Sequence, residues 1–369
     1  MFENVREYVD RVCIQEKRIP YIDLIVRQDH RELFRYYAGL SNVTGKEQLI
    51  LYSASKPVTA FAAAKLAEEG RLDVSRKVAD YLPEFDRVFV TGEDGLPRRP
   101  EIAMTVKHLL TMSAGFDYDF TTEPLKRLIA ETEGRCTTRQ VVDALIESPL
   151  RFEPGTRFYY SLCLDVLAAV IEEAAGMQFS EYVDRTFFAP LGMARSTFSN
   201  TRVTVADCLP TCLARKDGSI VPNEGHLDFV TYPNYESGGG GMKSTVEDYI
   251  RFADMLACGG VSEDGRRLLK AETIREFAAL RQEEASIQET FGCIQGDAYG
   301  YGYGLRVRKV PTAWGLPVGE FGWDGAFGSY VMVDPVRHVS VFIGMNVLGW
   351  PNVFRGNHLE IVREIYGNL

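Results

Sequence analysis

The chain has 369 residues, of which 46% are hydrophobic and 25% charged, and its formal net charge is −10. This composition is ordinary for a globular protein, and the length suggests two domains. An acidic chain without a Lys/Arg-rich block repels phosphate backbones, which argues against nucleic acid as a partner. The sequence contains no run of 18 apolar residues, so we expect no membrane-spanning helix.

The amino-terminal segment carries Val5, Val9 and Val12 near helical spacing, with charged residues between them. This pattern predicts an amphipathic helix and lacks the apolar core of a signal peptide. The seven cysteines are scattered, and an odd number without a secretion signal argues for free thiols. We therefore expect a cytoplasmic protein.

Strand patterns lie at both ends of the chain and helical patterns lie in the middle. Residues 21–40 resemble two strands around a polar turn, and strand patterns return after residue 300. Glycine stops and capping boxes mark several of the helices between them. Helices are predicted over residues 57–69, 161–175 and 357–367, with capping boxes at Thr137/Gln140 and at Ser244/Glu247.

This order of elements predicts one sheet domain with a helical insertion. We expect residues 1–70 and 244–369 to form an α/β sheet domain, residues 71–243 to form a mostly helical subdomain, and the active site to lie in the cleft between them. Short connections, such as the turn at Asp334-Pro335, favour an antiparallel sheet. The predicted fold class is therefore α+β, with an antiparallel sheet flanked by helices.

The segment Ser-Ala-Ser-Lys-Pro at residues 53–57 contains a candidate nucleophile. Proline is tolerated only in the first turn of a helix, so Pro57 places the helix start near Ser53, with Lys56 on the same face. The positive end of the helix dipole, together with burial, would favour a neutral amine that takes the serine proton. Ser-x-x-Lys is expected about once by chance in a chain of this length, so an ordinary solvated lysine stays open.

Other signatures of enzymatic chemistry are absent from the sequence. It contains no GxSxG, HExxH, P-loop or GxGxxG motif. His108 has apolar neighbours, which favours a packed core residue over a catalyst. Cys208 and Cys212 have the spacing of metal ligands but lack a second pair or a nearby histidine, so no metal site is predicted. Asp165 is assigned no chemistry.

Several segments, in the right order, resemble the serine β-lactamase and penicillin-binding-protein superfamily, most closely its class C-like esterase branch, the family VIII carboxylesterases. They include YSASKPVTA, MTVKHLLTMSAGFDYD, PGTRFYYSLCLDVLAAV, SGGGGMKSTVEDY and FGWDGAFGSYVMVDP. The resemblance covers nearly the whole chain. It implies a β-lactamase/transpeptidase-like fold and a serine hydrolase that needs no metal or other cofactor.

The resemblance also implies roles for individual residues. Ser53 would be the acylated nucleophile, and Lys56 would help to activate it. Tyr160 would share the proton transfer, with Tyr159 as the alternative at that motif. A tyrosinate beside a lysine is a workable base, because the cation stabilises the phenolate. The backbone N–H of Ala326 would complete an oxyanion hole with that of Ser53.

The implied substrate-binding residues are Leu162, Trp323, Asp324 and Gly325, and two of them depart from the family pattern. Leu162 stands where most relatives have an asparagine that bonds a substrate amide. Trp323 replaces a lysine that holds the carboxylate of β-lactams, and a hydrogen bond to such a charged group contributes about 1.5–3 kcal/mol. Gly325 would let the strand edge approach the substrate. Both departures favour neutral acyl esters.

Two further sets of residues are candidates for lining the site. Aromatic residues near the carboxyl-terminal strands would wall an apolar acyl pocket, although aromatic residues in strands often belong to the core. These aromatic residues are Trp314, Phe321, Trp323 and Phe327. Asp117, Tyr118 and Asp119 are predicted in a loop near the cleft, where a plain loop is an equal alternative.

We therefore expect a serine hydrolase that forms an acyl-enzyme, with a carboxylesterase on small acyl esters as the preferred interpretation. The same nucleophile would serve a β-lactamase or D-amino-acid peptidase, or acyl transfer to an alcohol acceptor. A binding protein that has lost turnover is disfavoured, because Ser53, Lys56 and Tyr160 are all present. The expected partner is a small-molecule ester or amide. The sequence leaves the oligomeric state open.

Overall fold

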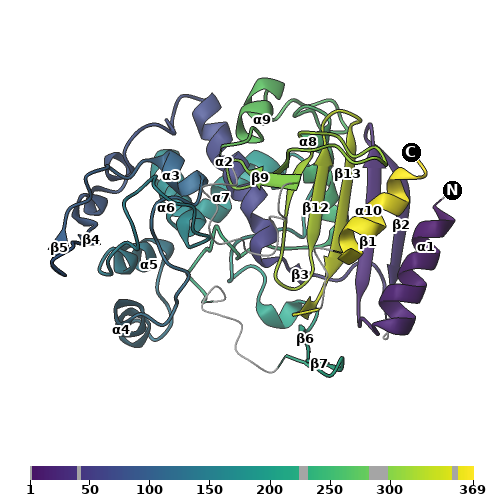
Figure 1. Ribbon diagram of the computed structural model, residues 1–369, viewed down its shortest axis with the longest axis horizontal. Coiled ribbons are helices and arrows are strands. Elements are labelled where there is room, and N and C mark those ends of the chain that lie inside the picture. Colours follow the sequence, from purple (N-terminus) through teal and green to yellow (C-terminus); the bar gives the residue numbers. More distant parts are fainter. Residues whose placement is uncertain (1, 40–42, 224–231, 282–297, 351–355) are drawn as a thin grey trace.

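The computed structural model describes residues 2–39, 43–223, 232–281, 298–350 and 356–369. Its centre is a seven-stranded sheet with the strand order β2-β1-β13-β12-β11-β10-β9, in which every neighbouring pair is antiparallel (Figure 1). The strands are β1 (Ile22–Gln28), β2 (Arg31–Ala38), β9 (Tyr299–Tyr301), β10 (Arg306–Arg308), β11 (Phe321–Asp324), β12 (Tyr330–Asp334) and β13 (Val339–Met345). The antiparallel sheet expected from the sequence is confirmed.

Helices cover both faces of the sheet. Helix α1 (Glu3–Tyr8), continued by a π-helical segment (Val9–Glu16), and α10 (His358–Tyr366) pack on one face. Helices α8 (Val246–Ala257) and α2 (Lys56–Glu68) pack on the other. The remaining helices are α3 (Val106–Leu110), α4 (Glu123–Glu131), α5 (Thr138–Leu145), α6 (Cys163–Ala175), α7 (Phe179–Val183) and α9 (Ala271–Phe277).

Short strands complete the described part of the chain. They are β3 (Leu49–Ile50), which pairs with β8 (Lys243–Ser244), β4 (Val90–Thr91) with β5 (Pro97–Arg98), and β6 (Cys212–Ala214) with both β7 (Ile220–Pro222) and β14 (Val347–Leu348). The central sheet takes its strands only from residues 22–38 and 299–345. The division into a sheet domain (1–70 and 244–369) and a helical subdomain (71–243) remains a prediction.

Alternation along the strands decides which side chains reach which face. In β13, Val341 and Ile343 pack beneath α1 and α10, whereas the Phe342 ring stacks on Tyr249 of α8 at 4.2 Å. Successive side chains of β11 likewise point to opposite faces of the sheet. Trp323 therefore faces the side of α2, and Asp324, which pairs in register with Tyr330, faces the side of α10.

The predicted capping signals had different outcomes. At α5, Thr137 and Gln140 form the expected reciprocal capping box. At α8 the prediction was wrong by one residue, because the cap is Thr245, whose side chain accepts the N–H of Asp248 at 3.2 Å. Ser244 is held in β8 instead, where it pairs with Leu49. Strand pairing there takes precedence over the local capping preference.

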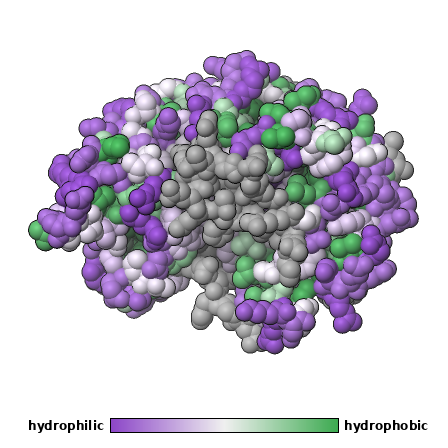
Figure 2. All heavy atoms as spheres, in the orientation of Figure 1, coloured by the Kyte–Doolittle hydropathy of each residue, from purple (hydrophilic) through white to green (hydrophobic). Residues whose placement is uncertain are grey.

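Apolar side chains are exposed at several places on the surface, and two of them, Leu280 and Val318, line one cavity of about 470 Å³. Figure 2 shows mainly hydrophilic residues over the periphery of one face, with hydrophobic residues between them. Isolated exposed apolar residues are normal in folded proteins. Large exposed examples are Tyr37, Leu96, Ile102, Leu280, Val310, Val318 and Val336. Among the described residues, we find no helix with the length and apolar character needed to cross a bilayer.

A buried ion pair joins β10 to β11. Arg306, which is 2% exposed, donates to the Asp324 carboxylate at 2.6 Å and to the Val331 carbonyl at 3.0 Å. Its guanidinium also lies 3.4 Å from Glu320 and 4.4 Å from the ring centre of Tyr330. One cation therefore compensates two carboxylates within the central sheet.

We predict that Arg306→Met lowers the free energy of unfolding by about 3–5 kcal/mol, because it removes the cation from two buried carboxylates. Denaturant unfolding followed by circular dichroism measures the change. Arg76→Met is the matched control, since Arg76 makes an exposed ion pair with Asp80 at 3.0 Å, and such pairs contribute little. An equal loss of stability in both variants would contradict the prediction.

Candidate active site

Ser53 lies on a 3-10 turn (Tyr52–Ser55) directly before α2. Tyr52 has a left-handed backbone with φ of 47°, which non-glycine residues rarely adopt. The hydroxyl of Ser55 donates to the Tyr52 carbonyl and accepts the N–H of Met242 at 3.1 Å. These bonds fix the turn, so Ser53 is held partly exposed at the amino end of a buried helix.

Two side chains converge on the Ser53 hydroxyl. Tyr160 Oη lies 2.7 Å and Lys56 Nζ 3.1 Å from Ser53 Oγ. Lys56 reaches it from one helical turn along the chain, whereas Tyr160 comes from the segment before α6. Tyr159 points elsewhere, with its ring 4.1 Å from the guanidinium of Arg151. The geometry brings together the three residues that the sequence singled out and favours Tyr160 over Tyr159.

Lys56 is fully buried, and its surroundings suit an ammonium group. Its Nζ donates to the Gly239 carbonyl at 2.6 Å and lies 4.6 Å from the ring centre of Tyr160 and 5.9 Å from that of Tyr118. A carbonyl acceptor and aromatic faces stabilise the charged form, although burial opposes it. These contacts act against the neutral amine that the helix dipole led us to expect.

Asp165, to which the sequence assigned no chemistry, holds the segment that binds Lys56. This buried carboxylate accepts hydrogen bonds from the Tyr235 hydroxyl at 2.7 Å, the Ser237 hydroxyl and the Gly239 N–H at 3.4 Å. A Cβ at Gly239 would collide with the Asp165 carboxylate. The available signal was an acidic residue on the otherwise apolar first turn of α6.

An aromatic stack surrounds Tyr160. Its ring lies between Tyr118, with centroids 5.6 Å apart and planes 7° apart, and Trp323, at 5.6 Å and 20°. The Trp323 indole N–H also donates to Tyr160 Oη at 3.3 Å. Trp323, at the position of the family's lysine, therefore supplies a neutral donor to the phenol oxygen. Tyr118, predicted only as part of a nearby loop, belongs to the site.

The end of β11 lies against the Ser53 turn. A Cβ at Gly325 would collide with the Leu51 carbonyl oxygen, so only glycine allows this approach. The Gly325 N–H donates to the Ser329 carbonyl at 2.7 Å, which closes the turn that carries Ala326. This is the setting that a hole built from the amides of Ser53 and Ala326 would need.

Two of the implied substrate-binding residues are engaged elsewhere. Asp324 faces the opposite side of β11, where Arg306 binds its carboxylate, so we withdraw it from the substrate-binding set. Leu162 is 1% exposed and packs in the core at the amino end of α6, so its side chain presents almost no surface to a ligand. Strand alternation turns Asp324 away from the site, and burial keeps Leu162 from contact with a ligand. Sequence motifs carry neither kind of information.

The predicted aromatic wall is also corrected. Phe321 packs against α2 in the core, and Trp314 packs against α10 on the other side of the sheet. The Phe327 ring lies 4.7 Å from that of Tyr52, beside Ser53. Phe327 and Trp323 therefore lie near the candidate nucleophile, and the other two do not form a wall with them.

One histidine and two cysteines were also considered as candidates from the sequence, and the structure shows their surroundings. His108 Nδ1 accepts the N–H of Thr105 at 3.2 Å and caps α3, and burial lowers the pKa of His108. This agrees with the packed histidine expected from its neighbours. Cys208 and Cys212 are free thiols, and burial raises the pKa of both.

The sequence is similar to a known protein family and to individual esterases and acyltransferases. A family model described as Beta-lactamase matches residues 2–363. Esterase EstB of Burkholderia gladioli is 29% identical over 372 residues, covering 90% of this chain and 88% of the esterase. Acyltransferase CalJ of Penicillium decumbens is 28% identical over 364 residues, covering 88% of this chain and 84% of that protein.

Among solved structures, the chain is similar to EstCE1, described as a hydrolase with promiscuous acyltransferase activity. The TM-score is 0.79 at 23% identity, with 99% of this chain and 98% of the other covered. This likeness confirms the β-lactamase/transpeptidase-like fold that the sequence motifs implied. The family match, with EstB and CalJ as sequence relatives, supports a serine hydrolase with esterase or acyl-transfer activity.

We predict that Tyr160→Phe lowers kcat about 10²–10⁴-fold, the usual contribution of a general acid–base group. The change removes the hydroxyl beside Ser53 and keeps the ring between Tyr118 and Trp323. Steady-state hydrolysis of a p-nitrophenyl ester measures the effect. Tyr159→Phe, the same change one residue earlier, is expected to retain the wild-type rate. A large loss of kcat in Tyr159→Phe together with a wild-type kcat in Tyr160→Phe would assign the proton transfer to Tyr159.

Proposed function

The chain belongs to the beta-lactamase family, and we propose that it is a serine hydrolase that acts on small acyl esters through an acyl-enzyme. The observation that carries the proposal is the convergence of Tyr160 Oη and Lys56 Nζ on Ser53 Oγ, at 2.7 and 3.1 Å. A serine hydroxyl bonded by a tyrosine, which can take its proton when ionised, and by a lysine amine is the arrangement of an activated serine.

In the proposed reaction, Ser53 Oγ attacks the carbonyl carbon of the ester while its proton moves to Tyr160 Oη. The tetrahedral intermediate collapses as Tyr160 returns that proton to the leaving alcohol, and the acyl group stays on Ser53. Water then repeats the sequence: it gives a proton to the Tyr160 phenolate and attacks the acyl carbon. The bond to Ser53 Oγ breaks as Tyr160 returns that proton to Ser53, which releases the acid and restores the free enzyme. Lys56, bonded to Ser53 Oγ, supplies the positive field that stabilises the tyrosinate.

The backbone amides of Ser53 and Ala326 are proposed to hold the developing oxyanion. In other hydrolases, removing one such preorganised donor raises the activation free energy by about 2.7–4 kcal/mol. The close approach of Gly325 to Leu51 supports this role, because it brings the β11 turn to the start of α2. No metal or other cofactor takes part in the proposed steps.

Substrate preference is proposed to follow from Trp323. Its indole donates to Tyr160 where related β-lactamases have a lysine, so the position offers no charge to the carboxylate of a β-lactam. The alternative, β-lactamase or D-amino-acid peptidase activity, would need another cation to replace it. We therefore propose neutral esters as the preferred substrates.

The first test compares the wild type with Ser53→Ala on p-nitrophenyl esters of increasing chain length and on a chromogenic cephalosporin. We predict ester turnover and an acyl adduct in the intact mass of the wild type, and loss of both in Ser53→Ala. Ser75→Ala is the matched control, since the exposed Ser75 hydroxyl bonds the Asp73 carboxylate at 2.7 Å, and we expect it to form the adduct. Full turnover by Ser53→Ala would reject the nucleophile, and efficient cephalosporin cleavage would reject the ester preference.

Acyl transfer is the second candidate function, because an acyltransferase is among the relatives. Hydrolysis and transfer share the acyl-enzyme and differ only in the second nucleophile. Adding short alcohols at increasing concentration is predicted to divert the acyl group from the free acid to a new ester, measured by mass spectrometry of the products. Formation of the free acid alone would restrict the activity to hydrolysis.

The cytoplasmic location expected from the sequence remains a prediction. Fractionation of the source cells, followed by an antibody against this chain, tests it directly.

A further inference from the structure

A cluster of three side chains lies outside the candidate active site. His30 belongs to the turn between β1 and β2, while Asp254 and Cys258 lie four residues apart at the end of α8. The Cys258 N–H donates to the Asp254 carbonyl at 2.9 Å, so both residues share one helical face. An imidazole nitrogen, a carboxylate oxygen and the thiol sulfur all lie within 4.8 Å of one another.

Only one oxygen of the Asp254 carboxylate has hydrogen-bond partners among the described residues. Asp254 is 1% exposed, and its Oδ2 lies 2.8 Å from His30 Nδ1 and 3.5 Å from an Arg27 guanidinium nitrogen. Its Oδ1 is buried and has no hydrogen-bond partner among the described residues. A buried carboxylate oxygen without a donor is costly, and the carboxylate group lies within 4.8 Å of an imidazole nitrogen and a thiol sulfur, which points to a cation.

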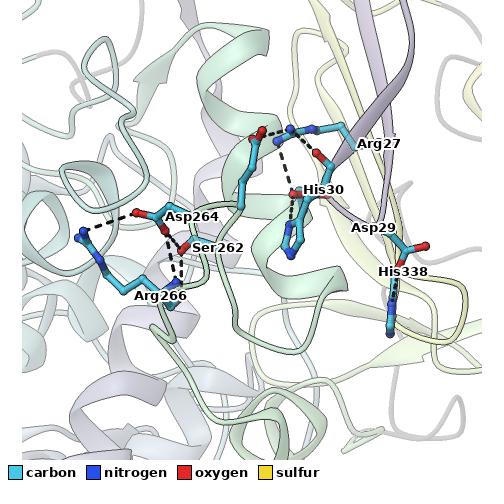
Figure 3. Close-up of polar contacts among 9 residues, drawn as sticks. Arg27, Asp29, His30, Ser262, Asp264, Arg266 and His338 are labelled. Atoms are coloured by element: carbon cyan, nitrogen blue, oxygen red, sulfur yellow. Dashed lines mark hydrogen bonds and ion pairs between the residues drawn. The ribbon is translucent and has the colours of Figure 1, made fainter.

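The neighbouring charges allow a divalent cation. Arg27 also donates to the His30 carbonyl and to Glu263, both at 2.6 Å, so it keeps two partners if Asp254 turns to a metal (Figure 3). A dication bound by one carboxylate, one thiolate and a neutral imidazole forms a site with no net charge. A cavity of about 530 Å³, lined in part by Arg27, Asp254 and Glu263, lies beside the cluster.

We propose that His30, Asp254 and Cys258 bind a zinc ion, with the fourth coordination position open to water. Nitrogen, oxygen and thiolate sulfur are the donors that zinc takes in proteins. Metal–ligand lengths of about 2.0–2.3 Å place the ligands of a tetrahedral site roughly 3.3–3.8 Å apart. His30 Nδ1 and Asp254 Oδ2 already lie 2.8 Å apart, and all three ligand atoms lie within 4.8 Å of one another, so rotation of the partly exposed His30 side chain has to adjust these spacings.

Zinc binding releases the thiol proton. Cysteine binds zinc as the thiolate, so metal binding displaces the thiol proton. The bound ion would join the β1–β2 hairpin to the end of α8, two elements more than 200 residues apart in the sequence. Its role would be to strengthen the sheet domain, and it does not depend on the reaction proposed at Ser53.

The experiment titrates untagged, full-length protein with Zn²⁺ by calorimetry and with Co²⁺ by absorption. The wild type is expected to bind one equivalent and to show a thiolate-to-cobalt charge-transfer band. Zinc at 100 times its Kd is expected to raise Tm by about 3 °C. Cys258→Ser should lose the band and at least tenfold in affinity, and His30→Ala should lose affinity in the same way.

Matched controls are present in the same region. His338 Nδ1 lies 2.8 Å from Asp29 Oδ1, a similar pair without a thiol, and Figure 3 shows it apart from His30. His338→Ala and Cys212→Ser are expected to keep wild-type binding and the band. Binding without the band, or equal affinity in Cys258→Ser and the wild type, would overturn the proposal. Because His30 lies in a partly exposed turn, His30→Ala decides the question if Cys258→Ser does not fold.

Discussion

The buried amine of Lys56 and its bond to the Gly239 carbonyl organise the candidate active site. A cation without surface exposure needs acceptors and aromatic faces around it, and segments far apart in the sequence supply them. Asp165 of α6 fixes Tyr235, Ser237 and Gly239, so the carbonyl reaches Lys56. In this view, a carboxylate that touches no reacting atom determines where the cation sits and hence how it meets Ser53.

The second organising element is strand β11. Its alternation sends Trp323 towards Tyr160 and Asp324 towards Arg306, so one strand supports the proton carrier on one face and a buried ion pair on the other. The following Gly325 lets the strand end meet the turn before Ser53. The candidate nucleophile, the candidate proton carrier and the proposed oxyanion donors thus depend on the register of one short strand.

The proposed substrate selection and the proposed activation of the serine meet at Trp323, which donates to Tyr160. Ser53, Lys56 and Tyr160 form a set that suits any acyl donor, whether the second nucleophile is water or an alcohol. Trp323 differs, because the family resemblance implies a lysine at its position. Trp323 instead places there a neutral N–H donor, which is already bonded to Tyr160. The zinc cluster proposed at the end of α8 acts on neither step and bears on the stability of the sheet domain.

The sequence by itself determined features that depend on neighbouring residues: the Ser53–Lys56 spacing at a proline-marked helix start, the capping box at Thr137, and strands at both ends of the chain. Family motifs added Tyr160 and the fold. Only the tertiary structure decided that Asp165 holds the lysine's acceptor, that Asp324 turns away from the site, that pairing with Leu49 moves the cap from Ser244 to Thr245, and that His30 meets Asp254 and Cys258. Local backbone preferences act over a few residues, whereas these contacts join residues far apart in the chain and arise only when helices and strands pack.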